Sequence, residues 1–260
     1  MRSFRTHGNN IMSILKPKAK MLIYGESGMG KSTSSMNLPI DKTLIINAEN
    51  KILPFRHALK FKQVSVSNYE RFEAIFQKAL LSDKIEIIFI DSLYSLSEKM
   101  LAHCEGLGGN KFDVYMEYSN LMLGFLDSVK TCDKHIIITC LAESMESSDG
   151  RIVSYPLTHG RKLKGSTISS KFTVVLYSTA VKANNGRTRY MFRVNSSGES
   201  NAKSPIGMFD DMVEVQNKKN DSDYRDFVDN DAYAVMNEFI KYYSYSEDEQ
   251  EETKKNEKKV

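Results

Sequence analysis

The sequence predicts an α/β fold of three layers, in which helices cover both faces of a mainly parallel central sheet. Short apolar runs alternate along the chain with segments of helical spacing, which is the pattern of alternating strands and helices. Residues 85–90 and 135–141 are apolar almost throughout, as is typical of parallel strands buried on both faces. A chain of 260 residues is also long enough for one substantial α/β domain.

The apolar pattern predicts the order of the elements. Strands are expected at residues 21–24, 43–47, 62–66, 85–90, 135–141, 172–177 and 188–194. Helices are expected at residues 31–37, 69–81, 93–104, 114–129 and 231–243, with Asn68 as the cap of the second. The last two strands form a C-terminal β-hairpin extension, because Asn184-Asn185-Gly186 between them is a good hairpin turn.

Composition divides the chain into one domain and two extensions. We expect a flexible N-terminal arm at residues 1–17, the α/β domain at residues 18–243 and a disordered charged tail at residues 244–260. No apolar run approaches the length of a membrane span and the chain does not begin with a signal-peptide core, so we expect no membrane contact and a cytoplasmic protein. Three cysteines, an odd number without metal spacing, predict buried thiols in a reducing compartment.

The net charge of +3 hides an uneven distribution. Residues 151–203 hold ten basic residues and one acidic residue, a net charge of +9, whereas residues 204–260 carry −7. So basic a segment in a single domain favours a polyanionic partner. The alternative is a solvated face on a β-hairpin.

Residues 25–32 read Gly-Glu-Ser-Gly-Met-Gly-Lys-Ser and match the phosphate-binding pattern G-x-x-x-x-G-K-[ST] at every fixed position. Glycines let the backbone curl so that consecutive N–H groups point at phosphate oxygens, and the positive end of the next helix adds to this anion site. The alternative is a glycine-rich turn that matches by accident. The pattern predicts a nucleoside triphosphate site, with ATP as ligand, built by Gly25, Glu26, Ser27, Gly28, Met29, Gly30, Lys31, Ser32 and Thr33.

Three further side chains complete the predicted chemistry. Lys31 is expected to reach the β- and γ-phosphates, and the Ser32 hydroxyl to bind Mg²⁺. Asp91 ends a buried strand, where a carboxylate holds Mg²⁺ through water, although an aspartate there can also be only a helix cap. Ser92 follows it where many ATPases have a glutamate. Glu49, at the tip of the next strand after the loop, is therefore the expected catalytic residue that orients water, the alternative being a solvated loop glutamate.

At this point the sequence resembles the RecA-like recombinase ATPases, and especially their short phage-encoded relatives, the single-strand annealing ATPases. The likeness covers roughly residues 18–205 and lies in the order and spacing of motifs. Residues 45–50 look like the strand that ends in the catalytic glutamate, residues 89–92 like the Mg²⁺-binding strand, and residues 136–140 like the strand that senses the γ-phosphate. The resemblance implies a RecA-like P-loop NTPase fold.

The resemblance also implies two loops that bind single-stranded DNA, at residues 104–111 and 142–164. The second loop contains the expected DNA-binding residues Arg151, Tyr155, Arg161, Lys162 and Lys164. In this family a glutamine senses the γ-phosphate, and basic residues of a neighbouring subunit face it. Here Thr139, Cys140 and Glu143 are the groups available at the end of the fourth strand, and the tentative phosphate-sensing set is Thr139, Arg193 and Lys203.

The leading hypothesis is a Mg²⁺-dependent ATPase that binds single-stranded DNA and promotes annealing or recombination, encoded by a phage and acting in the host cytoplasm. Its further expected partners are copies of itself and a single-strand-binding or annealing protein. Alternatives on the same fold are a helicase-loader-like or circadian-type motor that acts through a protein partner, and a nucleotide-gated adaptor that hydrolyses ATP poorly. A small-molecule kinase is disfavoured by the basic segment and by the lack of an obvious lid.

Overall fold

The computed structural model describes residues 17–146, 150–182, 186–196, 198–210, 212 and 227–257, with side chains placed up to residue 244. The predicted N-terminal arm therefore lies outside the described residues, apart from residue 17. Two of the three residues of the predicted hairpin turn, Asn184 and Asn185, also lie outside them.

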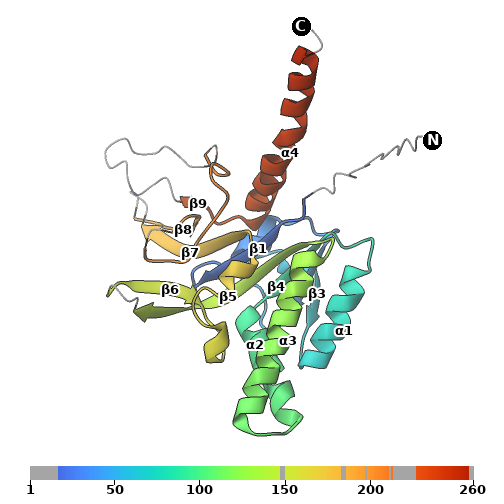
Figure 1. The fold of residues 1–260 in the computed structure, drawn as a ribbon, viewed down its shortest axis with the longest axis vertical. Coiled ribbons are helices and arrows are strands. Elements are labelled where there is room, and N and C mark those ends of the chain that lie inside the picture. Colours follow the sequence, from blue (N-terminus) through green and yellow to red (C-terminus); the bar gives the residue numbers. More distant parts are fainter. Residues whose placement is uncertain are drawn as a thin grey trace, which may run out of the picture.

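Nine strands form one sheet in the described part of the chain, in the order β3-β2-β4-β5-β1-β7-β8-β9, with β6 paired to β5 alone (Figure 1). The strands are β1 (Lys20–Gly25), β2 (Thr43–Asn47), β3 (Lys62–Ser65), β4 (Ile87–Asp91), β5 (His135–Glu146), β6 (Ile152–Pro156), β7 (Val174–Lys182), β8 (Thr188–Arg193) and β9 (Phe227–Asp229). From β3 to β7 the neighbouring strands pair in parallel, whereas β6, β8 and β9 pair antiparallel. The predicted mainly parallel sheet with a C-terminal hairpin is confirmed.

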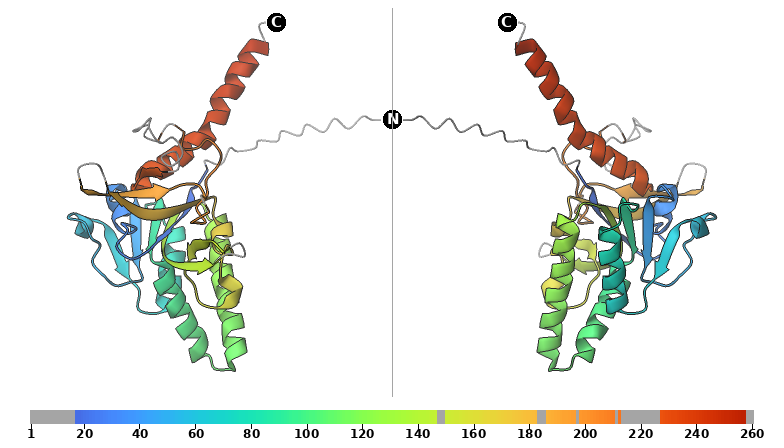
Figure 2. Two further views of the ribbon diagram at one scale, coloured as in Figure 1. Left: turned by 90° about the vertical axis from the view of Figure 1, so that its left-hand side faces the viewer. Right: turned by 90° about the vertical axis from the view of Figure 1, so that its right-hand side faces the viewer.

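Helices cover both faces of this sheet. The α-helices are α1 (Tyr69–Leu80), α2 (Leu93–Gly106), α3 (Lys111–Thr131) and α4 (Ala232–Glu257). Leu22 and Tyr24 of β1 pack into the cluster that contains α1, α2 and α3, whereas Met21 and Ile23 pack into the cluster that contains the start of α4. This alternation along one strand produces the predicted three layers. Figure 2 shows that α4 leaves the sheet at the end opposite to the hairpin of α2 and α3.

The predicted helix at residues 31–37 is wrong, because the chain forms only the short 3-10 helix η1 (Thr33–Asn37). Two causes act together. The Ser34 and Ser35 hydroxyls bond back to the carbonyls of Lys31 and Ser32, at 2.6 and 2.8 Å, in competition with a regular helix. Pro39 then excludes helical backbone at the residue before it. So short a helix has little dipole, and the anion site depends on the loop itself.

The loop expected at residues 142–164 contains regular structure instead. The end of β5 pairs with β6 from Ala142–Pro156 to Glu146–Ile152, and the short 3-10 helices η3 (Arg161–Leu163) and η4 (Ser169–Lys171) follow. Residues 142–146 are half-buried or exposed. Because this part of β5 is not covered on both faces, it lacks the continuous apolar run that marks a buried parallel strand.

At the C-terminus, α4 continues to Glu257, whereas the sequence predicts a disordered tail from residue 244. Residues 247–257 are rich in Glu, Lys and Gln, which are good helix formers. The three-residue strand β9 was too short to be predicted from an apolar pattern. Within the described part of the chain, every helix is either too short or too polar to cross a membrane.

Candidate nucleotide site and basic groove

The loop after β1 has the backbone that its sequence pattern predicts. Gly28 and Gly30 have φ angles of +80° and +86°, in the left-handed region that side chains with a β-carbon rarely adopt. Gly25 is needed for a different reason, since a β-carbon there would lie 2.5 Å from the Ser178 carbonyl oxygen of β7. Three glycines thus let the loop curl tightly beside the sheet, so that its N–H groups can face a phosphate chain.

Lys31 lies folded against this loop. Its Nζ donates hydrogen bonds to the carbonyl oxygens of Gly25 and Glu26, at 2.9 and 2.7 Å. Burial lowers the pKa of the Lys31 ammonium group, and the nearby Asp91 carboxylate opposes this shift. A buried ammonium group held at the mouth of the loop is positioned to meet a triphosphate.

Asp91 ends β4 and is only 4% exposed. Its carboxylate accepts a hydrogen bond from the Thr139 hydroxyl of β5, and the Ser32 side chain lies beside it. Burial raises the pKa of Asp91. The structure therefore brings together the two predicted metal-binding residues, and their hard oxygen atoms beside a phosphate loop fit Mg²⁺.

Glu49 lies beside Asp91 at the carboxyl edge of the sheet. The N–H groups of Ala48 and Glu49 donate to the Asp91 carbonyl oxygen, at 2.6 and 3.1 Å. The Ser92 hydroxyl donates to Glu49 Oε1 at 3.0 Å, and the Lys51 ammonium group lies 3.3 Å from Oε2. Glu49 is therefore a held carboxylate next to the candidate metal site, not a free loop side chain.

A second site lies at the hairpin of α2 and α3. Asn110 caps α3, and its Oδ1 accepts from the N–H groups of Phe112 and Asp113, at 2.9 and 3.1 Å. This cap starts α3 three residues before the predicted position. The helix therefore includes Phe112, which the sequence placed before it, and Phe112 and Tyr115 are exposed whereas Tyr118 is buried.

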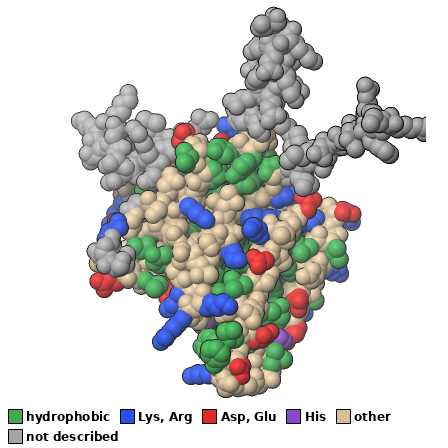
Figure 3. All heavy atoms as spheres, viewed as in Figure 1, with side chains coloured by type: hydrophobic (Ala, Val, Ile, Leu, Met, Phe, Trp, Pro, Cys, Tyr) green, Lys and Arg blue, Asp and Glu red, His purple; other side chains and the backbone are tan. Residues whose placement is uncertain are grey.

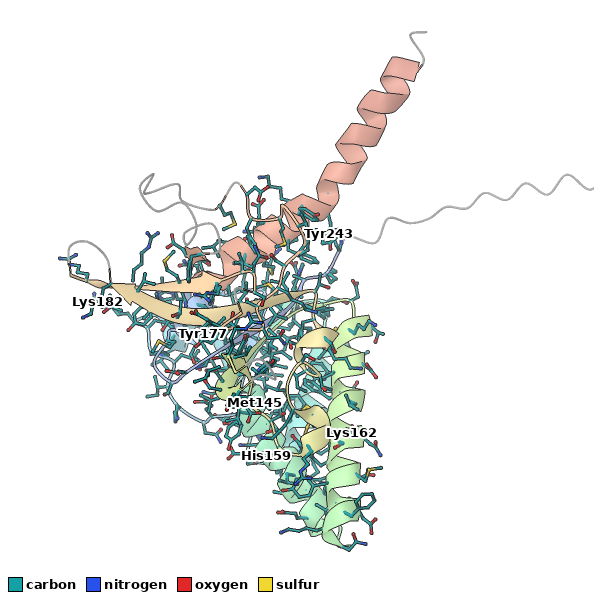
Figure 4. The ribbon with its side chains drawn as sticks, turned by 60° about the vertical axis from the view of Figure 1, so that its left-hand side comes forward. Met145, His159, Lys162, Tyr177, Lys182 and Tyr243 are labelled. Atoms are coloured by element: carbon teal, nitrogen blue, oxygen red, sulfur yellow. The ribbon has the colours of Figure 1, made fainter. Side chains whose placement is uncertain are left out.

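A groove of about 640 Å³ separates the start of α3 from the segment at residues 160–164. We call it the basic groove; it is lined by Lys111, Phe112, Tyr115, Met116, Ser119, Gly160, Arg161, Lys162 and Lys164. Lys162 lies close to α3 in Figure 4. Gly160 has a φ of +77°, and a β-carbon there would meet the Tyr115 ring at 3.3 Å, so the two walls approach closely.

Apolar side chains beside the cations of the basic groove are exposed to solvent. Phe112 is 73% exposed, and Tyr115 and Met116 are also exposed. Figure 3 shows hydrophobic side chains gathered near the lower end of the molecule, with Lys and Arg side chains around them. These exposed rings beside cations make the basic groove the second candidate site.

Comparison with known families decides what kind of domain holds these two sites. The model of the AAA domain family matches residues 17–206, which include the glycine loop, Glu49, Asp91 and the basic groove. The chain belongs to the AAA domain family. Such a domain is a nucleotide-binding ATPase domain of the P-loop NTPase type, in agreement with the sheet order and the loop. No curated protein matches the chain.

Within this AAA domain, the predicted phosphate-sensing residues lie in different places. Thr139 binds Asp91, as described above. Arg193 pairs with Glu199 at 2.9 Å and lies over the Phe227 ring, and the backbone of Lys203 pairs with Val175, in the first half of β7. The single chain thus brings only Thr139 of this set to the nucleotide site. Cys140 is buried, which raises the pKa of its thiol to about 12, so it stays a neutral thiol.

The five predicted DNA-binding residues also lie in two different places within the AAA domain. Arg161, Lys162 and Lys164 line the basic groove. Tyr155 lies in β6 opposite Glu143, and Arg151 comes directly before that strand, beside Gly198. Sequence reasoning missed Phe112 and Tyr115, because the helix was predicted to start only at residue 114. Asn110, a good N-cap residue, was the signal that could have placed Phe112 on this helix.

Proposed function

We propose that this AAA domain is a Mg²⁺-dependent ATPase that binds single-stranded DNA and promotes annealing or recombination, for a phage and in the host cytoplasm. The observation that carries the proposal is the basic groove, which combines four cationic side chains with exposed aromatic rings. Copies of the chain and a single-strand-binding or annealing protein are proposed as further partners.

In this proposal the loop at residues 25–33 holds the triphosphate through its N–H groups, and Lys31 turns from its own loop carbonyls to the phosphates. Ser32 and Asp91 would hold Mg²⁺, which neutralises charge on the phosphates when bound. Glu49 accepts a proton from the attacking water and orients it, because its carboxylate is already fixed beside Asp91 by Ser92.

The groove suits single-stranded DNA for two physical reasons. Cations from both walls neutralise backbone phosphates, which accounts for affinity without sequence preference. Phe112 and Tyr115 offer ring faces on which unpaired bases stack, a contact worth about 1–3 kcal/mol per base. A duplex, whose bases are already stacked and paired, cannot use these rings.

Strand β5 connects the two sites. Thr139 near its middle binds Asp91, and Glu143, four residues further, forms an ion pair with Lys164 at 3.1 Å in the groove wall. Any nucleotide-dependent movement at Asp91 therefore acts on the strand that positions Lys164. This supports an ATP-dependent hold on DNA.

The proposal is tested by measuring the affinity for a fluorescent oligo-dT strand, and the ATPase rate with and without it. Phe112→Ala and Lys111→Ala are expected to weaken DNA binding about tenfold each and to remove DNA stimulation of the ATPase. Lys130→Ala is the matched control, since it removes the same charge from the far end of α3 and should change neither. Unaltered DNA binding by both groove variants would contradict the proposal.

A second candidate is a nucleotide-gated adaptor that acts through a protein partner, and the exposed side chains Leu107, Phe112 and Met116 favour it. Glu49→Gln separates the two functions. An ATPase should lose at least a hundredfold in turnover while it retains ATP binding. An adaptor should show slow turnover in both proteins and bind its partner equally well.

A further inference from the structure

The C-terminal part of the chain, beyond the matched residues 17–206, is tied directly to the phosphate loop. Asn230 Nδ2 donates to the Ser178 hydroxyl at 3.1 Å, and this hydroxyl donates in turn to the Met29 carbonyl oxygen of the loop. Asn37, at the end of η1, donates to Asp231 Oδ2 at 2.7 Å. The junction of β9 and α4 therefore forms part of the wall around the nucleotide site.

Tyr190 on β8 belongs to the same wall. A β-carbon at Gly30 would lie 3.3 Å from the Tyr190 ring and 3.0 Å from Asn230 Nδ2, so both side chains lie against the phosphate loop. The ring is nevertheless 44% exposed. Its strand is braced by the ion pair of Arg189 with Asp229, at 2.7 Å. Tyr190 is thus a fixed aromatic ring with one open side, in contact with the loop.

The sheet order determines on which side of the loop a nucleoside must lie. Asp91 ends β4 and Glu49 comes shortly after β2, both on the β5 side of β1, and the γ-phosphate must face them. The α-phosphate and the nucleoside then extend toward the other side, where β7 and β8 lie. These strands continue past the end of β1, because Tyr177 is level with Tyr24 and β7 runs on to Lys182, near the tip of the hairpin in Figure 4.

We propose that Tyr190 binds the nucleobase of the triphosphate by stacking, and that Asn230 is the positioning residue that holds this wall against the loop. The purine of ATP, with its large ring face, is the ligand this site would take. The inference rests on the proposed nucleotide site but not on DNA binding. It also gives a role in nucleotide binding to Asn230, which lies outside the matched residues 17–206.

The test compares ATP with tripolyphosphate, which has the phosphates but no base, by competition against a fluorescent ATP analogue in the absence of DNA. Tyr190→Ala is expected to weaken ATP binding about tenfold and to leave tripolyphosphate binding unchanged, whereas Tyr190→Phe retains both. Because the side chain is half-exposed, neither variant should unfold the protein. Lys130→Ala, at the far end of α3, is the control and should bind both ligands as the wild type does.

Three results would overturn the inference. Equal binding of ATP and tripolyphosphate by the wild type would show that no base site exists. An equal loss of both ligands in Tyr190→Ala would show that the ring only supports the loop, and no loss of either would show that it is uninvolved. A wild type that binds ATP normally but no DNA leaves the inference standing and contradicts the proposed function alone.

Discussion

His135 shows how a single buried residue links folding to pH. It begins β5 at the sheet edge opposite the nucleotide site, and it is 9% exposed. Its Nδ1 accepts a hydrogen bond from the Ala19 N–H at 3.1 Å, so the ring must be neutral there. Burial lowers the pKa of His135 to about 4, with Lys18 and Lys20 as further causes.

This shift predicts an acid-sensitive fold. Between pH 6.5 and 4 the unfolded chain protonates this histidine and the folded chain does not, so stability is present above pH 6.5 and lost as the pH falls. The loss from this residue reaches about 3 kcal/mol at pH 4. His135→Asn retains an acceptor but does not titrate. Its urea unfolding free energy at pH 7, 5.5 and 4 should fall less steeply than that of the wild type, and equal slopes would exclude His135 as the cause.

Residue by residue, the sequence predicted the side chains that belong to a local motif. Lys31 and Ser32 follow from the loop pattern, and Glu49 and Asp91 from their place at strand ends, and the structure brings all four to one edge. The bonds of Thr139 to Asp91 and of Ser92 to Glu49 could not be predicted, because they depend on which strands are neighbours. The same holds for Gly25, whose constraint comes from a backbone carbonyl far along the chain.

Among the strands and helices, β5 is the element that connects the nucleotide site with the basic groove. Its buried half lies between β1 and β4, and its half-exposed end carries the Glu143–Lys164 ion pair. The apolar run predicted the first half of β5, whereas the second half has no run to predict it. One strand can thus be buried in its first half and lie at the surface in its second half. Only the buried half has an apolar pattern from which a strand can be predicted.

The Glu143–Lys164 ion pair predicts how ATP changes the affinity for DNA. Glu143→Gln removes the carboxylate charge that competes with DNA phosphates for Lys164 in the groove wall, and a partly exposed ion pair of this kind is worth about 0.2–1 kcal/mol. We therefore expect DNA affinity without nucleotide to rise about two- to fivefold, and the effect of ATP on affinity to shrink. Binding of labelled oligo-dT with and without ATP checks both. An unchanged ratio between the two conditions would show that β5 does not couple the sites.

For the molecule as a whole, the basic segment does not form one surface. Of its ten cations, Arg161, Lys162 and Lys164 reach the basic groove, where Lys111 from outside the segment joins them. Lys182 and Arg189 belong to the hairpin beside the nucleotide site, and the latter is paired with Asp229. The charge count predicted a polyanionic partner. Only the fold shows which cations line the basic groove and which form ion pairs between neighbouring strands.

This division predicts how steeply DNA binding depends on salt. Each phosphate neutralised on a single strand contributes about −0.7 to the slope of log affinity against log salt, so four groove cations give a slope of about −3. A rise from 50 to 200 mM salt then weakens binding about fiftyfold. If the whole +9 segment contacted DNA, the slope would be about −6. Lys162→Ala should reduce the slope by about 0.7 while Lys130→Ala leaves it unchanged, and a slope near −6 that Lys162→Ala does not alter would place DNA outside the basic groove.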